Sequence, residues 1–276
     1  LKEDVLRAKA ATDGIVGVNI MYAVKNFYEL VTGSIEAGVD LIITGAGFSR
    51  DIFKIGKKYN VPVAMIVSSP TLARLAEKLG AAAVIVEAKE AGGHLGTDKP
   101  LRTIFPPIRD VVKKIPLIAA GGITNGYEMA EMMDEYGADG IQIASRFVLS
   151  EECPVADEFK QAYLDAKKDD IVLTSSPVGL PGRAINSPFV QAVAKGDDVT
   201  AEKCKLKCLK KCDYHYCIND RLNAARSGDI DKGLFFSGEN TYKMKSILPV
   251  AEIFKQFINQ AESVYREKRG FAPPVE

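Results

Sequence analysis

Tryptophan, net charge and long apolar runs are all absent from this sequence of 276 residues. Its 36 basic side chains balance its 36 acidic ones, so it lacks the broad positive field with which proteins bind nucleic acid. Its apolar runs, such as residues 81–86, are far shorter than the roughly 20 residues of a transmembrane helix, and Leu1 begins a charged segment rather than a signal peptide. We therefore expect a cytoplasmic protein that binds neither nucleic acid nor a membrane.

Histidine and cysteine are scarce, with two and five residues. An odd number of cysteines suits a reducing compartment better than a disulfide framework. Hydrophobic residues make up 47% of the chain and charged residues 26%, which is a globular composition. The length is enough to bury one large core or two modest ones. Collagenous, mucin-like and small disulfide-stapled classes are thereby excluded.

Short β-branched runs alternate with segments of helical periodicity up to about Leu149. The runs are continuously apolar, as expected of parallel strands that are covered on both faces. Segments 71–79 and 127–136 place apolar residues three and four apart, which predicts crossover helices. The predicted strands are residues 15–21, 39–44, 61–67, 82–87, 115–120 and 139–144. Three junctions into a strand also carry a glycine that would cap the preceding helix, at Gly38, Gly80 and Gly137.

Repeated βα units of this kind predict an α/β fold, either a doubly wound sheet or a TIM (β/α)8 barrel. Residues 1–11 predict a helix, and a crossover helix follows a strand, so the sequence begins within a repeat. We expect a TIM barrel whose first two strands lie outside this sequence. The visible strands are then strands three to eight.

We expect three parts in the chain. Residues 1–168 would form the barrel, and residues 169–246 a loop followed by a helical region that carries the cysteines. Within this second part, the Ser-, Pro- and Gly-rich residues 171–188 predict an irregular loop, and residues 189–228 predict a helical segment. Residues 247–276 would form a C-terminal helix that packs back on the barrel.

A glycine pair, Gly121 and Gly122, separates the predicted strand 115–120 from the helix after it. Glycine lets backbone N–H groups approach an anion, and a helix N-terminus favours negative charge. In TIM barrels a phosphate commonly lies at the loops after strands seven and eight. The predicted strand 139–144, counted as the eighth, ends at Ala144-Ser145. The two loops together predict a phosphate site, and a tight turn without a ligand is the alternative.

His94 lies in a glycine-rich segment, residues 87–96, which follows the strand counted as the sixth. Side chains at that end of a barrel strand reach the catalytic mouth. The unperturbed imidazole pKa near 6.5 suits proton transfer at neutral pH. We predict a catalytic histidine, and a solvated surface histidine is the alternative.

Four segments occur in an order and spacing that resemble a known family: VNI (18–20), AGGHLG (91–96), AGGI (120–123) and IQIASRF (141–147). The chain resembles the FMN-dependent nitronate monooxygenases, formerly called 2-nitropropane dioxygenases, over nearly all of residues 1–195. Flavin-dependent enoyl-acyl-carrier-protein reductases belong to the same group. The SPVGLPGR loop (176–183) and residues 238–247 also resemble this family.

The resemblance implies a bound FMN and a catalytic base, His94. It also implies contacts of the flavin with Asn19, Glu87, Ala91, Gly92, Gly93, Gly121, Gly122, Ile143, Ala144 and Ser145. The sequence departs from the family where Ala144-Ser145 replaces the usual Gly-Thr, and where residues 63–69 lack a lysine that some members place near the flavin.

The implied reaction oxidises alkyl nitronates or nitroalkanes with O2, giving a carbonyl compound and nitrite. Flavin- and NAD(P)H-dependent reduction of an enoyl-acyl-carrier-protein is the alternative, and a flavin-binding protein without turnover is a third. The SPVGLPGR loop favours the monooxygenase. The expected partners are O2 and a small-molecule substrate, and a homodimer stays open.

Four cysteines, Cys204, Cys208, Cys212 and Cys217, follow the pattern C-x3-C-x3-C-x4-C. This spacing differs from the C-x2-C knuckles of zinc ribbons, and on a helix the first and third thiols lie too far apart for one metal. We therefore predict no metal site, with metal binding as the alternative to a buried or redox-sensitive thiol stripe. The basic residues 203–211 predict a solvated face, with docking of an acidic carrier protein as the alternative.

Overall fold

A six-stranded parallel sheet forms the body of the computed structural model, which describes residues 1–197, 204 and 206–268. Its strand order is β1-β2-β3-β4-β6-β7, and each of its strands was predicted to within a residue or two at most ends. The strands are β1 (Gly17–Met21), β2 (Leu41–Gly45), β3 (Val63–Val67), β4 (Ala83–Glu87), β6 (Leu117–Ala120) and β7 (Gly140–Gln142).

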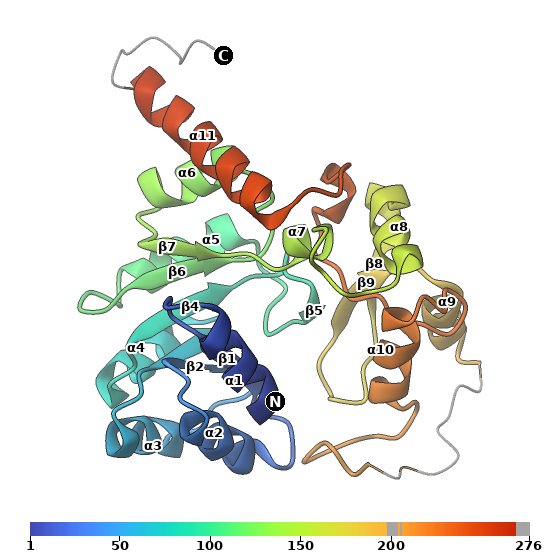
Figure 1. Ribbon diagram of the computed structural model, residues 1–276, viewed down its shortest axis with the longest axis horizontal. Coiled ribbons are helices and arrows are strands. Elements are labelled where there is room, and N and C mark those ends of the chain that lie inside the picture. The colour runs from blue at the N-terminus through green and yellow to red at the C-terminus, as the bar shows by residue number, and fades with distance from the viewer. Residues whose placement is uncertain (198–203, 205, 269–276) are drawn as a thin grey trace.

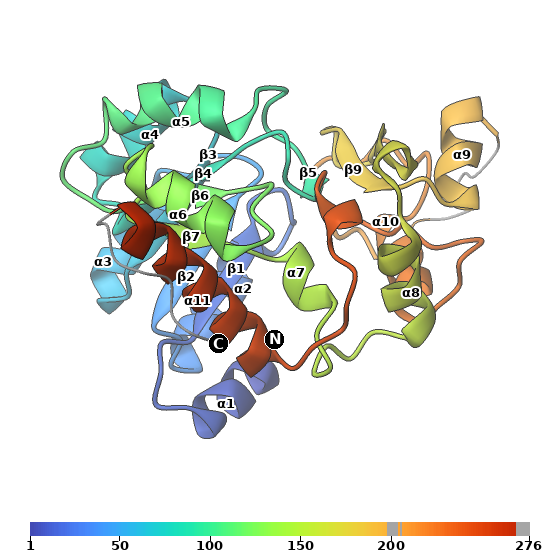
Figure 2. The same cartoon turned by 90° about the horizontal axis from the view of Figure 1, so that it is seen from above.

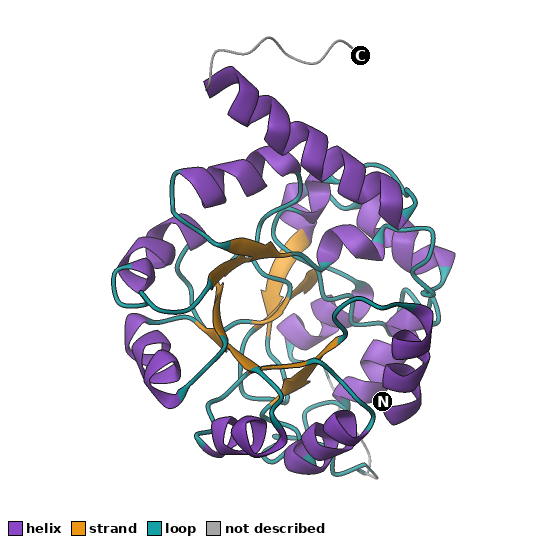
Figure 3. Ribbon diagram, turned by 60° about the vertical axis from the view of Figure 1, so that its left-hand side comes forward, coloured by secondary structure: helices purple, strands orange, loops and turns teal. Residues whose placement is uncertain are grey.

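The sheet curls, and its helices lie on the outside (Figure 3). Strand side chains such as Ile42, Val84 and Leu117 are fully buried in the main core cluster, while their neighbours, such as Ile43 and Ile118, are partly buried and pack against a smaller cluster. The curled parallel sheet with helices outside it confirms an α/β fold of the TIM-barrel type. The helices are α1 (Lys2–Ala11), α2 (Phe27–Glu36), α3 (Asp51–Tyr59), α4 (Pro70–Leu79), α5 (Leu101–Arg109) and α6 (Gly126–Asp134).

The predicted glycine caps are present in the turns into β2, β4 and β7. Gly38, Gly80 and Gly137 have φ values of 87°, 91° and 69°. These are left-handed conformations that a residue with a Cβ adopts only under strain. The glycine therefore recurs in these turns because the backbone needs a positive φ value at all three positions.

Residues 171–188, which we predicted to be an irregular loop, instead form a hairpin. β8 (Ile171–Thr174) pairs antiparallel with β9 (Gly182–Ile185), and β5 (Gly93–His94) pairs with the other edge of β9. The prediction was wrong because the Ser-, Pro- and Gly-rich connection between two short strands dominates the composition of the whole segment. The pairing brings β5 of the barrel part beside the hairpin (Figure 1).

The prediction of a helical segment over residues 189–228 was wrong in its middle. α9 (Pro188–Lys195) and α10 (Ile218–Arg226) are helical, but residues 206–217 are not. Lys207 and Tyr214 have φ values of 46° and 63°, which interrupt a right-handed helix. The predicted helical stripe of thiols is therefore not formed.

The non-helical segment 206–217 is bonded to the loop that follows β1. The Lys25 amide donates to the Cys208 carbonyl at 2.8 Å, and the Lys210 amide donates to the Ala23 carbonyl at 2.9 Å. The Lys210 ammonium also lies 3.2 Å from the centre of the Tyr22 ring. Long-range pairing, which local periodicity does not reveal, sets the conformation of this segment.

The C-terminal helix α11 (Val250–Lys268) packs against α6. Figures 1 and 2 show it crossing the barrel part, away from the region of α8, α9 and α10. Its buried face consists of Ile253, Phe257 and Ala261, whereas the apolar side chains of Phe254 and Ile258 are half exposed. The remaining elements are α7 (Ser145–Val148), α8 (Asp157–Asp165) and the 3-10 turns η1 (Lys168–Asp170) and η2 (Thr241–Lys243).

Among the described residues, no helix is both long and apolar enough to cross a membrane. Lys203 and Lys205, which belong to the basic stretch 203–211, lie outside the described residues.

Candidate functional site

A cavity lies where the loops after β4, β6 and β7 converge at the carboxyl ends of these strands. Side chains and backbone from residues 87–92, 120–124 and 142–145 line it. Residues within 238–241 reach it from the region after β9. This end of the sheet is where α/β barrels bind their ligands.

The cavity brings together most of the residues that the resemblance assigned to the flavin. Two of those residues are not in its lining: Asn19 is exposed in β1, and Gly93 pairs with Arg183 of β9. The predicted residues in the lining are Glu87, Ala91, Gly92, Gly121, Gly122, Ile143, Ala144 and Ser145. Three separate loops thus meet at one cavity.

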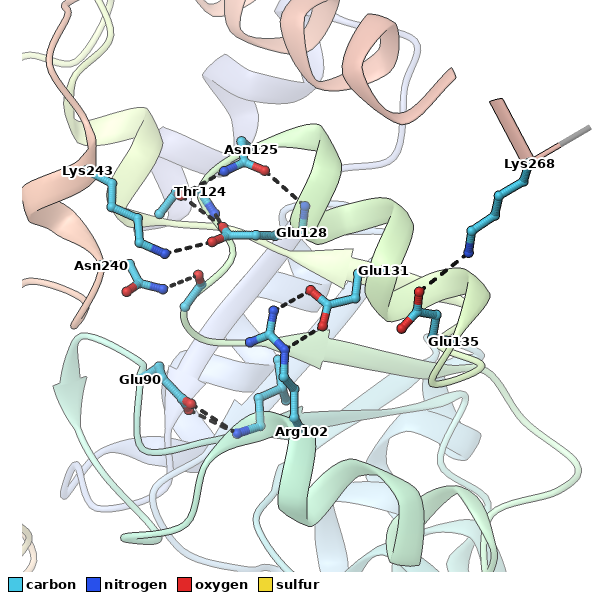
Figure 4. Close-up of polar contacts among 12 residues, drawn as sticks. Glu90, Arg102, Thr124, Asn125, Glu128, Glu131, Glu135, Asn240, Lys243 and Lys268 are labelled. Atoms are coloured by element: carbon cyan, nitrogen blue, oxygen red, sulfur yellow. Dashed lines mark hydrogen bonds and ion pairs between the residues drawn. The ribbon is translucent and has the colours of Figure 1, made fainter. Parts of the chain in front are cut away.

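The cavity is also lined by Gly238, Asn240 and Thr241, for which no role was predicted. The Asn240 side-chain amide donates to the carbonyl of Gly122 at 2.6 Å (Figure 4). The Gly238 amide donates to the Ser145 hydroxyl at 3.1 Å. The signal that could have found these residues was the resemblance over residues 238–247, which named no individual contact.

Close packing of the loops explains why the glycines are needed. A Cβ on Gly121, whose φ is 97°, would lie 2.9 Å from the Ala91 amide nitrogen. A Cβ on Gly92 would lie 2.7 Å from the Ser237 carbonyl carbon. Real Cβ contacts are longer than this, so larger residues would push the loops apart.

The N-terminus of α6 offers fewer free donors to an anion than the sequence suggested. The Gly126 amide donates to the side chain of Gln260 at 2.8 Å, and the Glu128 amide donates to that of Asn125 at 2.9 Å. The Glu128 carboxylate in turn accepts from the Thr124 amide at 2.7 Å and from Lys243 at 2.9 Å (Figure 4). Anion binding would therefore depend on the glycine loops and on hydroxyl groups.

One buried hydroxyl of the cavity has the properties of a ligand donor. Thr241 is 1% exposed, and its Oγ1 has no hydrogen-bond partner among the described residues. A buried hydroxyl without a partner costs free energy unless a ligand supplies one. Thr241 Oγ1, the Ser145 hydroxyl and the Gly121-Gly122 backbone thus fit a phosphate that is held by neutral donors.

Two carboxyl groups also line the cavity, and they differ in their bonding. The Glu90 carboxylate accepts the Leu101 amide at 3.0 Å. Burial raises the pKa of Glu87 to about 7, so part of its population is protonated at neutral pH. A protonated Glu87 does not repel an anionic ligand, and it can donate a hydrogen bond to one.

His94 is held at the start of the small sheet, two residues after the cavity residue Gly92. Its Nε2 lies 2.7 Å from the Ser176 hydroxyl, and its ring meets the edge of the Phe236 ring at a centroid distance of 5.1 Å. Burial lowers the pKa of His94 from its ordinary value, which favours a neutral imidazole at neutral pH. His94 is therefore not the solvated surface group of the alternative interpretation.

Arg183 of β9 ties the hairpin to the loop before His94. It is 7% exposed, its Nε donates to the Lys89 carbonyl at 3.0 Å, and its guanidinium lies 3.3 Å from the Glu239 carboxylate. Lys89 also faces Glu239, at 3.6 Å. A buried guanidinium with fixed donors makes a rigid junction of this kind.

Of the cysteine-bearing segment, none of the residues that the structure describes, 204 and 206–217, lines the cavity. All five cysteines are free and half-buried, and the Cys208 sulfur accepts from the Asn219 side chain at 3.1 Å. Burial raises the pKa of the Cys208 and Cys217 thiols, which disfavours the thiolate. Across residues 1–197, 204 and 206–268, no group of three His, Cys, Asp or Glu side chains is placed to hold a metal ion.

A curled parallel sheet with a glycine-lined cavity at its carboxyl end, and a half-buried histidine beside that cavity, is typical of TIM-barrel enzymes that bind a phosphate-bearing cofactor. The family model for nitronate monooxygenase matches residues 2–260, so the chain belongs to the nitronate monooxygenase family. This membership confirms the family resemblance and places the chain among the flavin-dependent oxidoreductases.

Three similar proteins illustrate the range of the family's relatives. A Mycobacterium tuberculosis protein, (3aS,4S,5R,7aS)-5-hydroxy-7a-methyl-1-oxo-octahydro-1H-indene-4-carboxyl-CoA dehydrogenase, is 31% identical over 70% of this chain and 54% of its own length. A probable nitronate monooxygenase of Staphylococcus aureus is 28% identical over 80% of this chain and 62% of its own length. The chain thus spans little more than half to three-fifths of these two relatives. FabK from Thermotoga maritima has a solved structure with a TM-score of 0.84 and 29% identity, over 98% of this chain and 84% of that one.

Proposed function

We propose that this chain carries the FMN site and the catalytic base of an enzyme that oxidises nitroalkanes or alkyl nitronates with O2. The products would be a carbonyl compound and nitrite. The observation that carries this proposal is the position of His94, a half-buried imidazole hydrogen-bonded to Ser176 and adjacent to the cavity loop. The same proposal includes a cytoplasmic location and the absence of nucleic-acid and membrane partners.

The role of His94 would be to remove the proton from the carbon next to the nitro group. A base must be neutral before it accepts a proton, and burial keeps this imidazole neutral at neutral pH. The anion that forms would lie beside the new imidazolium, which stabilises it electrostatically. A nitronate that is supplied as the anion would not need this step.

FMN would be held by the groups that line the cavity. Its phosphate would be bound by the Gly121-Gly122 backbone, the Ser145 hydroxyl and Thr241 Oγ1. Glu87 would face the remainder of the FMN molecule. When bound, FMN supplies the acceptor for two electrons. The protein would orient the substrate, exclude water and hold the proton.

A second candidate, oxidoreduction of an acyl thioester, is favoured by two of the similar proteins. The printed name of the M. tuberculosis relative is that of a CoA-thioester dehydrogenase, and the FabK structure matches 98% of this chain. The lowered pKa of His94 favours its proton-accepting form, and the SPVGLPGR loop (176–183) resembles that of the monooxygenases. We therefore rank nitroalkane oxidation first.

Anaerobic reduction of the bound flavin separates the candidates. Purified protein is loaded with FMN and mixed with an alkyl nitronate or with NADH, and the loss of visible flavin absorbance is followed, with free FMN as the control. Bleaching by the nitronate alone, followed by nitrite release on adding O2, supports the proposal. Bleaching by NADH with turnover of an enoyl thioester favours the second candidate, and no bleaching by either reagent contradicts both.

A further inference from the structure

His94 and Gly182 lie opposite each other where β5 pairs antiparallel with β9. Side chains at opposite positions of antiparallel strands lie side by side on the same face of the sheet. Because Gly182 has no side chain, the place beside the imidazole is open to a residue from elsewhere in the chain. The ring of Phe236 lies there, with its centre 5.1 Å from the centre of the imidazole and the two ring planes 71° apart.

The room for this ring depends on the glycine. A Cβ on Gly182 would lie 2.7 Å from Phe236 Cε1 and 3.3 Å from its Cζ, and the first of these distances is shorter than real Cβ contacts. The φ value of Gly182 lies outside the left-handed region, so the backbone conformation does not require glycine there. The space taken by Phe236 therefore explains why residue 182, the second glycine of the SPVGLPGR loop, has no side chain.

The backbone of Phe236 is anchored independently of its ring. Phe236 forms an antiparallel bridge with Ala184 of β9, and the Ser237 amide donates to the Arg183 carbonyl at 3.2 Å. The hydroxyl of Tyr163, a residue that is 2% exposed, donates to the Phe236 carbonyl. A substitution that changes only the side chain of Phe236 therefore leaves these backbone contacts available.

Two contacts set the orientation of the His94 ring. The Ser176 hydroxyl lies 2.7 Å from Nε2, a ring atom close to the Cβ–Cγ axis about which the imidazole turns. A hydrogen bond at that atom restrains the turning weakly, and this torsion has a broad energy profile. The phenyl ring of Phe236 meets the imidazole edge-to-face, and turning the imidazole would break that contact. Phe236 therefore restrains the motion that the bond to Ser176 leaves free.

We propose that Phe236 is a positioning residue, which fixes the plane of the His94 imidazole from the space that Gly182 leaves open. Its effect on proton removal rests on the proposed function of His94 as a base, whereas the contact between the rings does not. A base must be aligned with the proton that it removes, so a fixed ring plane favours the transfer. Phe236 also packs against the apolar cluster that contains Phe189 and Leu234, and a residue that only filled that cluster would change stability alone.

Proton–carbon NMR of the histidine rings tests the contact without any turnover. The full chain has only two histidines, so 13C-histidine labelling gives two sets of ring signals, and His215→Gln assigns them. We expect Phe236→Leu to shift the ring signals of His94, because the ring current of the phenyl group is lost, and to leave those of His215 in place. Phe235→Leu is the matched control, since Phe235 is buried and packs against Phe159 instead. It should shift neither set.

Kinetics of the FMN-loaded protein test whether the ring plane matters to the reaction. Phe236→Leu should lower kcat for a neutral nitroalkane about fivefold, the factor that corresponds to roughly one aromatic pair, with KM and FMN affinity within about twofold. Oxidation of the preformed nitronate should change less than about twofold, because it needs no base. Gly182→Ala should lower kcat in the same way, because its Cβ displaces the phenyl ring.

Unshifted His94 signals in Phe236→Leu, or a kcat equal to that of the native chain, overturn the inference. Equal losses of kcat in Phe236→Leu and Phe235→Leu also overturn it, because they show a general loosening of the region. If the native chain oxidises no nitroalkane, the proposed function fails while the NMR still decides the contact between Phe236 and His94.

Discussion

The barrel part and the region after β7 contribute different kinds of groups to the same site. The barrel part presents mainly backbone, in the glycine loops around Gly92 and Gly121-Gly122. The later region presents side chains, among them Ser176, Asn240 and Thr241. Backbone positions are fixed by the strands that carry the loops, whereas side-chain hydroxyls and amides set donor direction. The barrel would thus place the cofactor, and the later region would orient the protons.

His94 is where the two contributions meet, because its backbone belongs to the barrel loop and its side chain is hydrogen-bonded to Ser176 of the later region. Changes at His94 should therefore affect chemistry while leaving the cofactor site intact. Changes in the glycine loops should weaken cofactor binding while leaving the proton transfer intact. The four predictions below test this separation, from the largest expected effect to the smallest.

Replacement of His94 should have the largest effect. His94→Ala removes the base, so turnover of a neutral nitroalkane should fall about 100-fold or more, since general-base catalysis contributes that much. FMN affinity, measured by titration of flavin fluorescence, should stay within about twofold, because His94 is not in the cavity lining. Oxidation of the preformed nitronate is the internal control. A variant that turns over nitroalkane at the native rate would remove His94 from the mechanism.

Addition of one methyl group to the barrel loop should weaken FMN binding without affecting the base, His94. Gly122 has a φ of 78°, and a Cβ there would lie 2.9 Å from the Glu90 Cβ. We expect Gly122→Ala to raise the Kd for FMN at least about tenfold, because the loop must shift as well as bear backbone strain. The measurement is an FMN titration.

Gly80→Ala is the matched control for this change. Gly80 has a φ of 91°, and a Cβ there would meet nothing within 4 Å. Both substitutions should lower the free energy of unfolding by roughly 1–2 kcal/mol through strain. FMN binding should suffer only in Gly122→Ala, and equal Kd values in the two variants would show that the glycine loop does not contact the cofactor.

Removal of a single hydroxyl should have a smaller effect. Thr241→Val deletes the unpartnered Oγ1 at nearly constant volume, so FMN affinity should fall about fivefold, the value of roughly one hydrogen bond. The protein without FMN should be no less stable, since a buried group without a partner is removed.

Thr44→Val supplies the control for this hydroxyl. Thr44 in β2 is also 1% exposed, and its Oγ1 likewise lacks a partner among the described residues, but it does not line the cavity. Chemical denaturation of the two variants should give similar stability changes. A loss of FMN affinity in Thr44→Val as large as in Thr241→Val would mean that the hydroxyl of Thr241 does not bind the phosphate.

The same contrast between regions explains how far the sequence alone could predict the structure. The strands of the barrel are buried on both faces, so continuous apolar runs in the sequence indicate them. The helices are buried on one face, so apolar residues at helical spacing indicate those. Gly38, Gly80 and Gly137 mark the turns because each turn requires a positive φ value at that one residue. Each of these signals is contained within a few neighbouring residues.

The later region lacks such local signals. The β8–β9 hairpin is defined by pairing with β5, and residues 206–217 are defined by bonds to the loop at Ala23 and Lys25. The same holds for Asn240, whose contact partner Gly122 lies 118 residues away in the sequence. The sequence therefore predicted the glycine loops and His94, but neither Thr241 nor the contact of His94 with Ser176. Those contacts depend on pairs that lie far apart in the sequence.

The pH dependence of turnover should show the smallest effect, and it tests how the later region tunes the base. His94 must be neutral to act, and burial against Phe236 and Ser176 lowers its pKa from 6.5. The kcat/KM for a neutral nitroalkane should therefore rise with pH through a midpoint below 6.5 and be level above neutrality. At pH 6.5 the enzyme should keep more than about half of its maximal rate, since an unperturbed histidine would keep half. A midpoint above 6.5 would show that the burial of His94 is offset by a charge that stabilises the imidazolium, and the separation between cofactor placement and proton control would then not hold.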